Sequence, residues 1–388
     1  MTKVTRSVIT SNTQKVVPSA AAFGLIVAAL LAWQQGSERL AIATLIGGLA
    51  GFSLYHAKFG FTAAWHRFVV ERRGAGLRAQ LLLIIVTSAI TFPLFYYGKD
   101  FGLSANGFVF PFGVAAAIGA FLFGIGMQLG GSCASGTLFT VGGGSTRMMV
   151  TLIFFILGSV IATAHLPEWN QLPRLPALSL VRSFGAFGAL AATAALLGAI
   201  ALISVHLERK HHGDIVQSAP TVSVLKGPWS YLLGAMMLVV VSVGTVLVLG
   251  RPWGITSGFA LWGAKWFHAV GIPIETWPYW ANSMGRVERS VMTDSTSVMN
   301  FGIILGAMLA AGMAGRFAPV LNISVRGLLT AIVGGLLMGY GARLAYGCNI
   351  GAYLGGLISG SLHGWGWLVF GFLGSIVGSK YKAKYGTD

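Results

Sequence analysis

The chain has 388 residues, of which 55% are hydrophobic and only 9% are charged, and its formal net charge is +16. A soluble domain would need more charge to cover its surface, and apolar runs of about 18 or more residues recur along the whole length, so a soluble enzyme is excluded. The positive charge does not indicate nucleic-acid binding, because the basic residues fall in short gaps between apolar runs, as in loops that face anionic lipid. Two cysteines cannot form a disulfide framework, so helix packing must supply the stability.

The apolar runs predict an all-α, polytopic membrane protein of about ten spans. The N-terminal segment is basic, but the apolar run after it lacks a convincing cleavage site, so we expect a retained first helix. Two stretches, 58–68 and 253–271, are apolar but carry glycine, threonine and basic residues, and re-entrant or half-helical segments fit them better. In chain order, the expected spans are 19–34, 41–57, 79–97, 109–129, 148–165, 183–205, 229–249, 298–315, 327–345 and 364–379.

The distribution of basic residues predicts the orientation of these spans. With both termini in the cytoplasm, 17 of the 26 lysines and arginines fall in cytoplasmic segments. Such an excess on the cytoplasmic side is the usual bias of membrane proteins. We therefore expect both termini to be cytoplasmic.

The chain also repeats itself. Segment 124–136, GIGMQLGGSCASG, matches segment 339–351, GYGARLAYGCNIG, at a constant offset that places Cys133 opposite Cys348. Five expected spans precede the central loop HLERKHHGD and five follow it, so the second half would be upside down in the membrane, as in many transporters. We expect a first membrane repeat over 1–205, a cytoplasmic linker over 206–228 and a second, inverted repeat over 229–388.

Each cysteine lies in a glycine-rich break between apolar runs. Small residues let backbone approach a ligand closely, and the helix that restarts after the break offers N–H groups and a positive dipole end to an anion. A neutral thiol is a weak donor with a polarisable sulfur, which suits an anion that presents sulfur or selenium. The alternatives are helix packing through small residues and inert buried thiols.

Arg343 lies in an apolar stretch shortly before Cys348, and its counterpart in the first half is Gln128. An ionisable residue at that depth is costly and is usually retained for an ion pathway, and a transported anion is its natural partner because the span holds no acid. Snorkelling to the surface is the alternative. Lys265 is expected to attract anions at the outer mouth or to be an interfacial anchor. The candidate pathway residues are Cys133, Cys348, Arg343, Gln128, Gly131, Ser132, Gly136, Gly347, Asn349, Gly351, Gly60, Thr62, Thr256, Ser257 and Lys265.

No motif predicts a cofactor, a resident metal or catalytic residues. The stretch GIGMQLGG has the wrong spacing for a dinucleotide loop, and no strand precedes it. The chain lacks the phosphate-binding motif GxxxxGK[ST] and an acidic cluster for a divalent metal. Any pumping must therefore use a gradient or another component.

Three stretches resemble the YeeE/YedE family of bacterial inner-membrane proteins, also called the sulphur-transport family: GGSCASGTL, GRPWGITSGFALWGAK and GYGARLAYGCNIGAYLGGL. The resemblance covers most of the chain. It implies a bacterial inner-membrane location, an hourglass-like helical fold and thiosulfate uptake through loop cysteines that relay the anion by S–H contacts. Carried over by motif, those cysteines are Cys133 and Cys348. The resemblance also implies a cytoplasmic sulfur-carrier protein as a partner, and some larger members are linked to selenium metabolism.

One position departs from the family pattern. Family members with an uptake role carry a further cysteine in a segment resembling RFCxTGG, where this chain has KFGFTAA at 58–64, so Gly60 replaces that cysteine. The expected function is import of a small sulfur-containing anion, with thiosulfate as the first candidate. Transport of a selenium species is the closest alternative. A membrane thiol oxidoreductase or sulfurtransferase is the alternative from another class.

Overall fold

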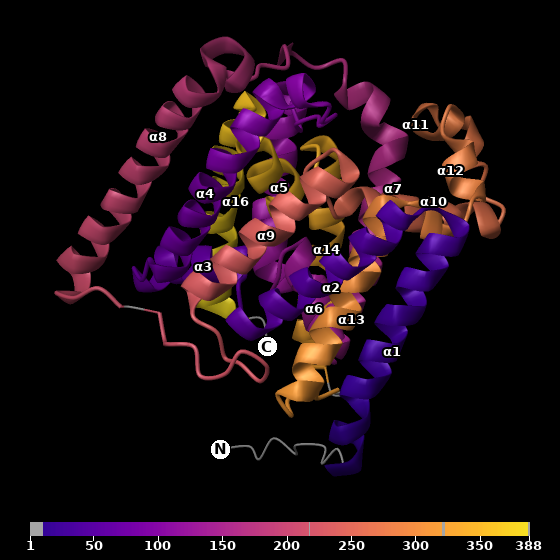
Figure 1. Ribbon diagram of the computed structural model, residues 1–388, viewed down its shortest axis with the longest axis horizontal. Helices are drawn as coiled ribbons and strands as arrows, with labels where there is room; N and C mark the ends of the chain where they lie inside the picture. The colour runs from indigo at the N-terminus through magenta and orange to yellow at the C-terminus, as the bar shows by residue number, and fades with distance from the viewer. Residues whose placement is uncertain (1–10, 217, 320–322, 387–388) are drawn as a thin grey trace.

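The computed structural model describes residues 11–216, 218–319 and 323–386, and these are almost entirely helical (Figure 1). Within these ranges, the one sheet joins two short antiparallel strands, β1 (Phe112–Gly113) and β2 (Arg174–Leu175). The prediction of an all-α protein is confirmed. Residues 1–10, which include two basic residues counted for the orientation, and residues 387–388 lie outside the described residues, as do 217 and 320–322.

A long helix lies at each of the ten places where a span was expected. Among the described residues, nine of these ten helices are long and apolar enough to cross a membrane, and the last, α16, is not one of the nine. The sixth of the ten, α8, continues seven residues into the expected linker. The helices are α1 (Ser11–Gln35), α2 (Glu38–Ala57), α4 (Ala75–Tyr97), α5 (Val114–Gly130), α7 (Thr146–Trp169), α8 (Leu180–His212), α9 (Tyr231–Leu249), α13 (Ser295–Met313), α14 (Val325–Leu344) and α16 (Leu362–Tyr385).

Short helices occupy the stretches that were expected to be half-helical or broken. Stretch 58–68 forms α3 (Phe61–His66) and the π-helical turn η1 (Arg67–Glu71), and stretch 253–271 forms α10 (Thr256–Ala269). After the two cysteines come α6 (Ala134–Gly142) and the π-helix η5 (Asn349–Leu354), which leads into α15 (Gly355–Leu357). The remaining short elements are η2 (Gly98–Phe101), η3 (Ile274–Thr276), α11 (Pro278–Ala281), α12 (Met284–Glu288) and η4 (Val291–Thr293).

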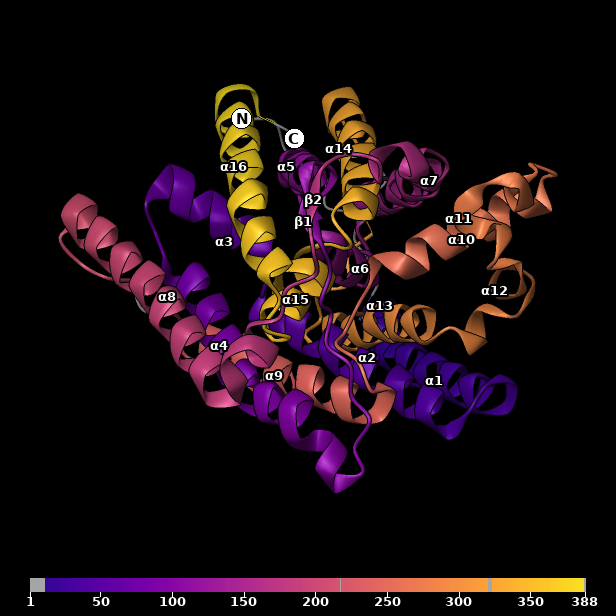
Figure 2. The ribbon, with the colours of Figure 1, turned by 90° about the horizontal axis from the view of Figure 1, so that it is seen from above.

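The long helices form two groups, and the short segments lie between them. Seen from above, α5, α7, α14 and α16 make one group and α1, α2, α4, α9 and α13 make the other, with α6 and α15 between them (Figure 2). The contacts agree, because α3 touches α4 and α16, while α6 and α10 each touch α7 and α13. Glycines allow the close packing: a Cβ on Gly334 of α14 would lie 2.3 Å from the backbone nitrogen of Gly130 on α5. Backbone breaks are therefore enclosed by protein, as a membrane requires.

The two ends of the described chain lie on the same side of the bundle. Near the start of α1, Gln14 donates a hydrogen bond to the carbonyl of Phe317 at 2.7 Å, in the connection between α13 and α14. At the end of α16, the carbonyl of Tyr385 accepts from Arg326 at 2.6 Å, at the start of α14. Helices α1 and α8 flank the bundle and expose apolar side chains, as expected for surfaces that face lipid (Figure 1).

Candidate functional site

Two cavities lie at opposite ends of the helix bundle. The larger has a volume of about 800 Å³ and the smaller one of about 430 Å³. Phe108, shortly before α5, lines the larger cavity, and Gly131, directly after α5, lines the smaller one. Helix α14 runs the other way, since Ala318 before it lines the smaller cavity and Gly347 after it lines the larger. Helices α5 and α14 therefore run in opposite directions between the two cavities.

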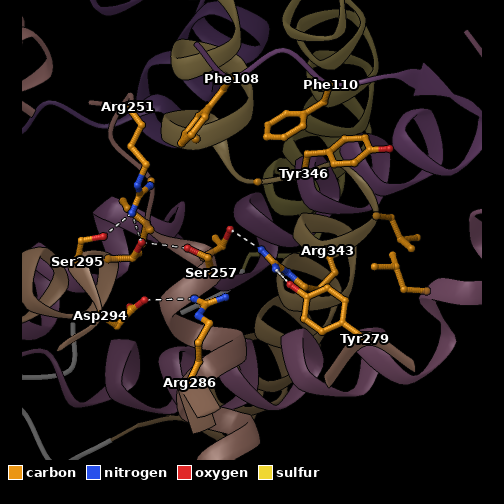
Figure 3. Close-up of a pocket in the computed structure, with 18 of the residues that line it drawn as sticks. Phe108, Phe110, Arg251, Ser257, Tyr279, Arg286, Asp294, Ser295, Arg343 and Tyr346 are labelled. Atoms are coloured by element: carbon orange, nitrogen blue, oxygen red, sulfur yellow. Dashed lines mark hydrogen bonds and ion pairs between the residues drawn. The ribbon is translucent and has the colours of Figure 1, made fainter. Parts of the chain in front are cut away.

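The larger cavity is lined by an excess of positive charge. Four arginines from different segments face it: Arg174, Arg251, Arg286 and Arg343. Among its described lining residues the one carboxylate is Asp294, which accepts from Arg286 at 3.2 Å (Figure 3). This carboxylate also caps α13, because it accepts from the backbone N–H of Ser297 at 2.8 Å. The net lining charge is therefore suited to an anion.

Arg343 is held in the wall of the larger cavity. Its guanidinium donates to the hydroxyl of Tyr279 at 3.1 Å and to that of Thr256 at 3.3 Å (Figure 3). Its buried Nε has no hydrogen-bond partner among the described residues. An arginine with a neutral environment and an unused N–H is a suitable ligand for an anion that enters the cavity.

Arg251 is a cavity residue that sequence reasoning missed. Its guanidinium donates to the hydroxyls of Ser295 at 2.6 Å and Thr296 at 3.1 Å. Burial lowers the pKa of Arg251 from its ordinary value; the negative charge of Asp294 opposes this shift and the positive charge of Arg286 adds to it. The stretch GRPWG, which begins at 250, contains this arginine, but nothing in the sequence indicates that it faces the same cavity as Arg343.

The first turn of α10 also faces the larger cavity. Both predicted residues Thr256 and Ser257 line it, and Ser257 donates to the hydroxyl of Thr296 at 3.1 Å. The carbonyl of Ile255, which precedes the helix, accepts from the buried amide of Asn300 at 3.0 Å, and this bond fixes the position of the helix start. The positive end of the α10 dipole thus points into a cavity already rich in arginine, which favours an anion further.

The two cysteines lie in the wall between the cavities. Cys133 is the N-cap residue of α6 and Cys348 that of η5; both are free and 1% exposed. They belong to one apolar cluster, and α6 and η5 contact each other. Around Cys348, Gly347 and Gly351 line the larger cavity.

The smaller cavity lies beyond Cys133. It is lined by Gly131 and Ser132 from the first cysteine loop and by the predicted residues Gly60 and Thr62 at the start of α3. Its basic side chains are those of Lys58, Arg316 and His56, and no carboxylate occurs among the described residues that line it. Both cavities therefore carry positive charge.

Besides the two cysteines, three predicted residues lie inside the wall and line neither cavity. Gln128 is fully buried and donates to the carbonyl of Thr62 at 3.2 Å and to the hydroxyl of Ser375 at 2.8 Å. Gly136 lies beneath Ser132 and Cys133, and Asn349 is fully buried in the first turn of η5.

Lys265 is not among the residues that line the larger cavity. Its ammonium group instead donates to the backbone carbonyls of Val287 and Arg289, close to the end of α12. The sequence does not show in which direction the side chain of a lysine in a half-helix points. The prediction for Lys265 therefore depended on an assumed direction. In the structure it braces the segment that follows α10.

Comparison with known proteins adds independent findings. The model of the family described as "Sulphur transport" matches residues 56–377. The chain is 24% identical over 343 residues to the thiosulfate transporter TsuA of Escherichia coli (strain K12), and this match covers 85% of the chain and 91% of the relative. It is 27% identical over 353 residues to TsuA of Spirochaeta thermophila, covering 85% of the chain and 95% of the relative.

A third relative has a higher sequence identity over a shorter region. The chain is 31% identical over 134 residues to the probable transporter YedE of Escherichia coli (strain K12), and this match covers 34% of the chain and 33% of the relative. The chain thus spans only about a third of the length of the YedE relatives that it matches. All of these names describe transporters, as the sequence analysis predicted for this chain. Since the family model matches most of the chain and the helices form a multi-pass bundle, this chain belongs to the sulphur transport family.

Proposed function

We propose that this protein imports a small sulfur-containing anion, with thiosulfate as the first candidate, across the bacterial inner membrane. One observation carries the proposal: two positively lined cavities lie at opposite ends of the bundle, and both thiols lie in the wall between them. Relatives that span most of the chain are named thiosulfate transporters. The anion would enter the larger cavity and leave from the smaller one.

The physical chemistry of the passage follows from this arrangement. An anion loses hydration on leaving water, and the arginines around the larger cavity, with the start of α10, compensate part of that loss. In the wall, a neutral S–H donates weakly to the anion, whereas a thiolate would repel it. The polarisable sulfur of Cys348 and then that of Cys133 would contact the sulfur of the substrate. Weak contacts at successive sites permit release, as conduction requires.

The proposal includes a division into two inverted halves. Helix α5 runs from the larger to the smaller cavity, and its sequence counterpart α14 runs in the opposite direction. Helix α7 begins beside the smaller cavity at Ser145, whereas α16 ends beside the start of α14. These directions support an arrangement in which the repeat mates Cys133 and Cys348 approach the wall from opposite sides.

The proposal also includes the orientation, with the smaller cavity and both termini in the cytoplasm. The excess of basic residues in segments on that side supports it. A cytoplasmic sulfur-carrier protein would then collect the anion from the smaller cavity. Cysteine-accessibility labelling of single cysteines introduced at Arg316 and at Arg174 tests the orientation: only the latter should react with an impermeant reagent added to intact cells.

Uptake by purified protein in liposomes tests the function. Vesicles that contain the protein should accumulate ³⁵S-labelled thiosulfate with saturable kinetics, whereas vesicles without it should not. Sulfate, selenite and selenide are the competing anions. If a selenium anion competes better than unlabelled thiosulfate, the substrate assignment changes; if no anion enters, transport itself is refuted.

A further inference from the structure

The segment after Cys348 contains three buried polar atoms that lack partners. Asn349 and Tyr353 are both 0% exposed, and neither the Asn349 amide nitrogen, nor its oxygen, nor the Tyr353 hydroxyl has a hydrogen-bond partner among the described residues. Burying a polar group without a partner is costly, and a phenylalanine and a leucine would fill the same space without that cost. The polar groups therefore call for a ligand.

The π-helical geometry of η5 places these two side chains on one face. The carbonyl of Cys348 accepts from the backbone N–H of Tyr353 at 3.3 Å, an i→i+5 bond, so a turn holds more than four residues. Asn349 and Tyr353, four positions apart, thus share a face. Gly351 lies midway between them in sequence and lines the larger cavity, so the shared face points away from that cavity and into the wall.

The ring of Tyr353 packs against two other helices, α16 and α3. It stacks on Trp367 of α16 with 6.0 Å between ring centroids and an interplanar angle of 12°. Its other neighbours are Phe61 and Trp65 of α3, each edge-on at 5.8 Å. Helix α3 begins directly after Gly60, which lines the smaller cavity. Three aromatic rings thus hold the Tyr353 ring between the second cysteine segment and helices α3 and α16.

We infer that Tyr353 and Asn349 bind the oxygen atoms of the transported anion while the thiols contact its sulfur. The inference rests on the proposed function and narrows its substrate class. A hydroxyl and an amide N–H are good donors to oxyanion oxygens, and a thiol suits a soft sulfur atom. The wall therefore selects anions that carry both sulfur and oxygen, as thiosulfate does, over hydrosulfide or selenide, which carry no oxygen.

The variant Tyr353→Phe tests this inference, because it keeps the stacked ring and removes only the hydroxyl. In liposome uptake, its KM for thiosulfate should rise about tenfold or more, as expected for a lost hydrogen bond to a charged group. The inhibition constant of hydrosulfide should stay unchanged, so discrimination between the two anions should fall by the same factor. The matched control is Tyr340→Phe, which removes a hydroxyl that bonds to His165 and Trp169, outside the residues that line either cavity.

The outcomes separate this inference from the proposed function. If wild-type protein takes up thiosulfate and Tyr353→Phe keeps its KM and its discrimination, the inference is overturned and the function stands. An equal loss for thiosulfate and hydrosulfide would also overturn it, since the hydroxyl would then not act through the oxygen atoms of the anion. Should Tyr353→Phe fail to accumulate in the membrane, Asn349→Leu provides the same test at similar side-chain size. If wild-type protein transports no anion, the proposed function fails first.

Discussion

The two cysteine segments begin alike and then differ. In both, a cysteine in extended backbone precedes a new helix and is almost completely buried. After Cys133 comes a regular α-helix in which the hydroxyl of Thr137 donates to the Cys133 carbonyl at 2.8 Å. After Cys348 comes a π-helix in which the Asn349 amide and the Tyr353 hydroxyl have no hydrogen-bond partner among the described residues.

This difference shows how one repeated motif can support two tasks. Where the local polar groups are satisfied by backbone, the segment is complete without a ligand; under the proposed function, its cysteine alone would contact the anion. Where they are unsatisfied, the segment holds unused donors that an anion can occupy. A π-helical turn in place of an α-helical one exposes a different face, and such turns are frequent at functional sites. The second segment is therefore suited to selection and the first to release.

The largest effect is expected from removing either thiol. Cys133→Ala and Cys348→Ala should each reduce thiosulfate uptake to the level of vesicles without protein, because the chain has only these two cysteines and no third one can replace the lost contact. Uptake rates measured on equal amounts of inserted protein check this. Ser135→Ala is the control, since it removes a hydroxyl 3.5 Å from the Cys133 sulfur and leaves the thiol in place. Normal transport by both alanine variants would contradict the proposal that the two thiols relay the anion.

Arg343→Gln should have the next largest effect. It removes a positive charge from the larger cavity but keeps a polar side chain near Tyr279 and Thr256, so the KM for thiosulfate should rise about tenfold while the maximal rate changes little. Lys265→Gln is the matched control, because Lys265 does not line the cavity and should leave the KM unchanged. An unaltered concentration dependence in Arg343→Gln would remove this arginine from the site.

Thr137→Val sharpens the comparison of the two cysteine segments. The substitution keeps the shape of the side chain and removes a hydroxyl that is already satisfied by the Cys133 carbonyl. It should lower the free energy of unfolding by about 1 kcal/mol and leave the KM for thiosulfate unchanged, in contrast to Tyr353→Phe. Thermal unfolding in detergent and uptake kinetics measure the two quantities. A raised KM in Thr137→Val would mean that the first cysteine segment also contributes to the selection of thiosulfate.

The smallest effect on stability is expected at Gly60. A Cβ at this position meets nothing within 4 Å, and the backbone φ of −124° suits any residue, so Gly60→Cys should change the unfolding free energy by no more than about 0.5 kcal/mol. The new thiol would line the smaller cavity and should raise the uptake rate, whereas Gly60→Ser should not. Equal rates for both variants would show that a third thiol adds nothing here.

Much of the fold could be predicted because its signal is local. Each long apolar run predicts one helix whatever its neighbours are, and a long helix lies at every one of the ten expected places. The internal repeat likewise predicted two related cysteine segments, and the structure brings α6 and η5 into contact. Hydropathy did not mark the start of the central linker, since α8 continues to His212. Helix ends are set by capping and neighbouring contacts more than by hydropathy.

The sequence by itself determined that this chain is a helical membrane protein with two glycine-flanked thiols and an unpaired intramembrane arginine, because composition and spacing carry that information. Only the tertiary structure decided which side chains share a cavity. Arg251 and Arg343 lie far apart in the chain yet line one chamber, and Lys265 points elsewhere. Nothing in the sequence distinguishes Tyr353 from the apolar residues around it. Its unused hydroxyl becomes visible only when three rings from two other helices surround it, because hydrogen-bond satisfaction depends on distant neighbours and not on local sequence.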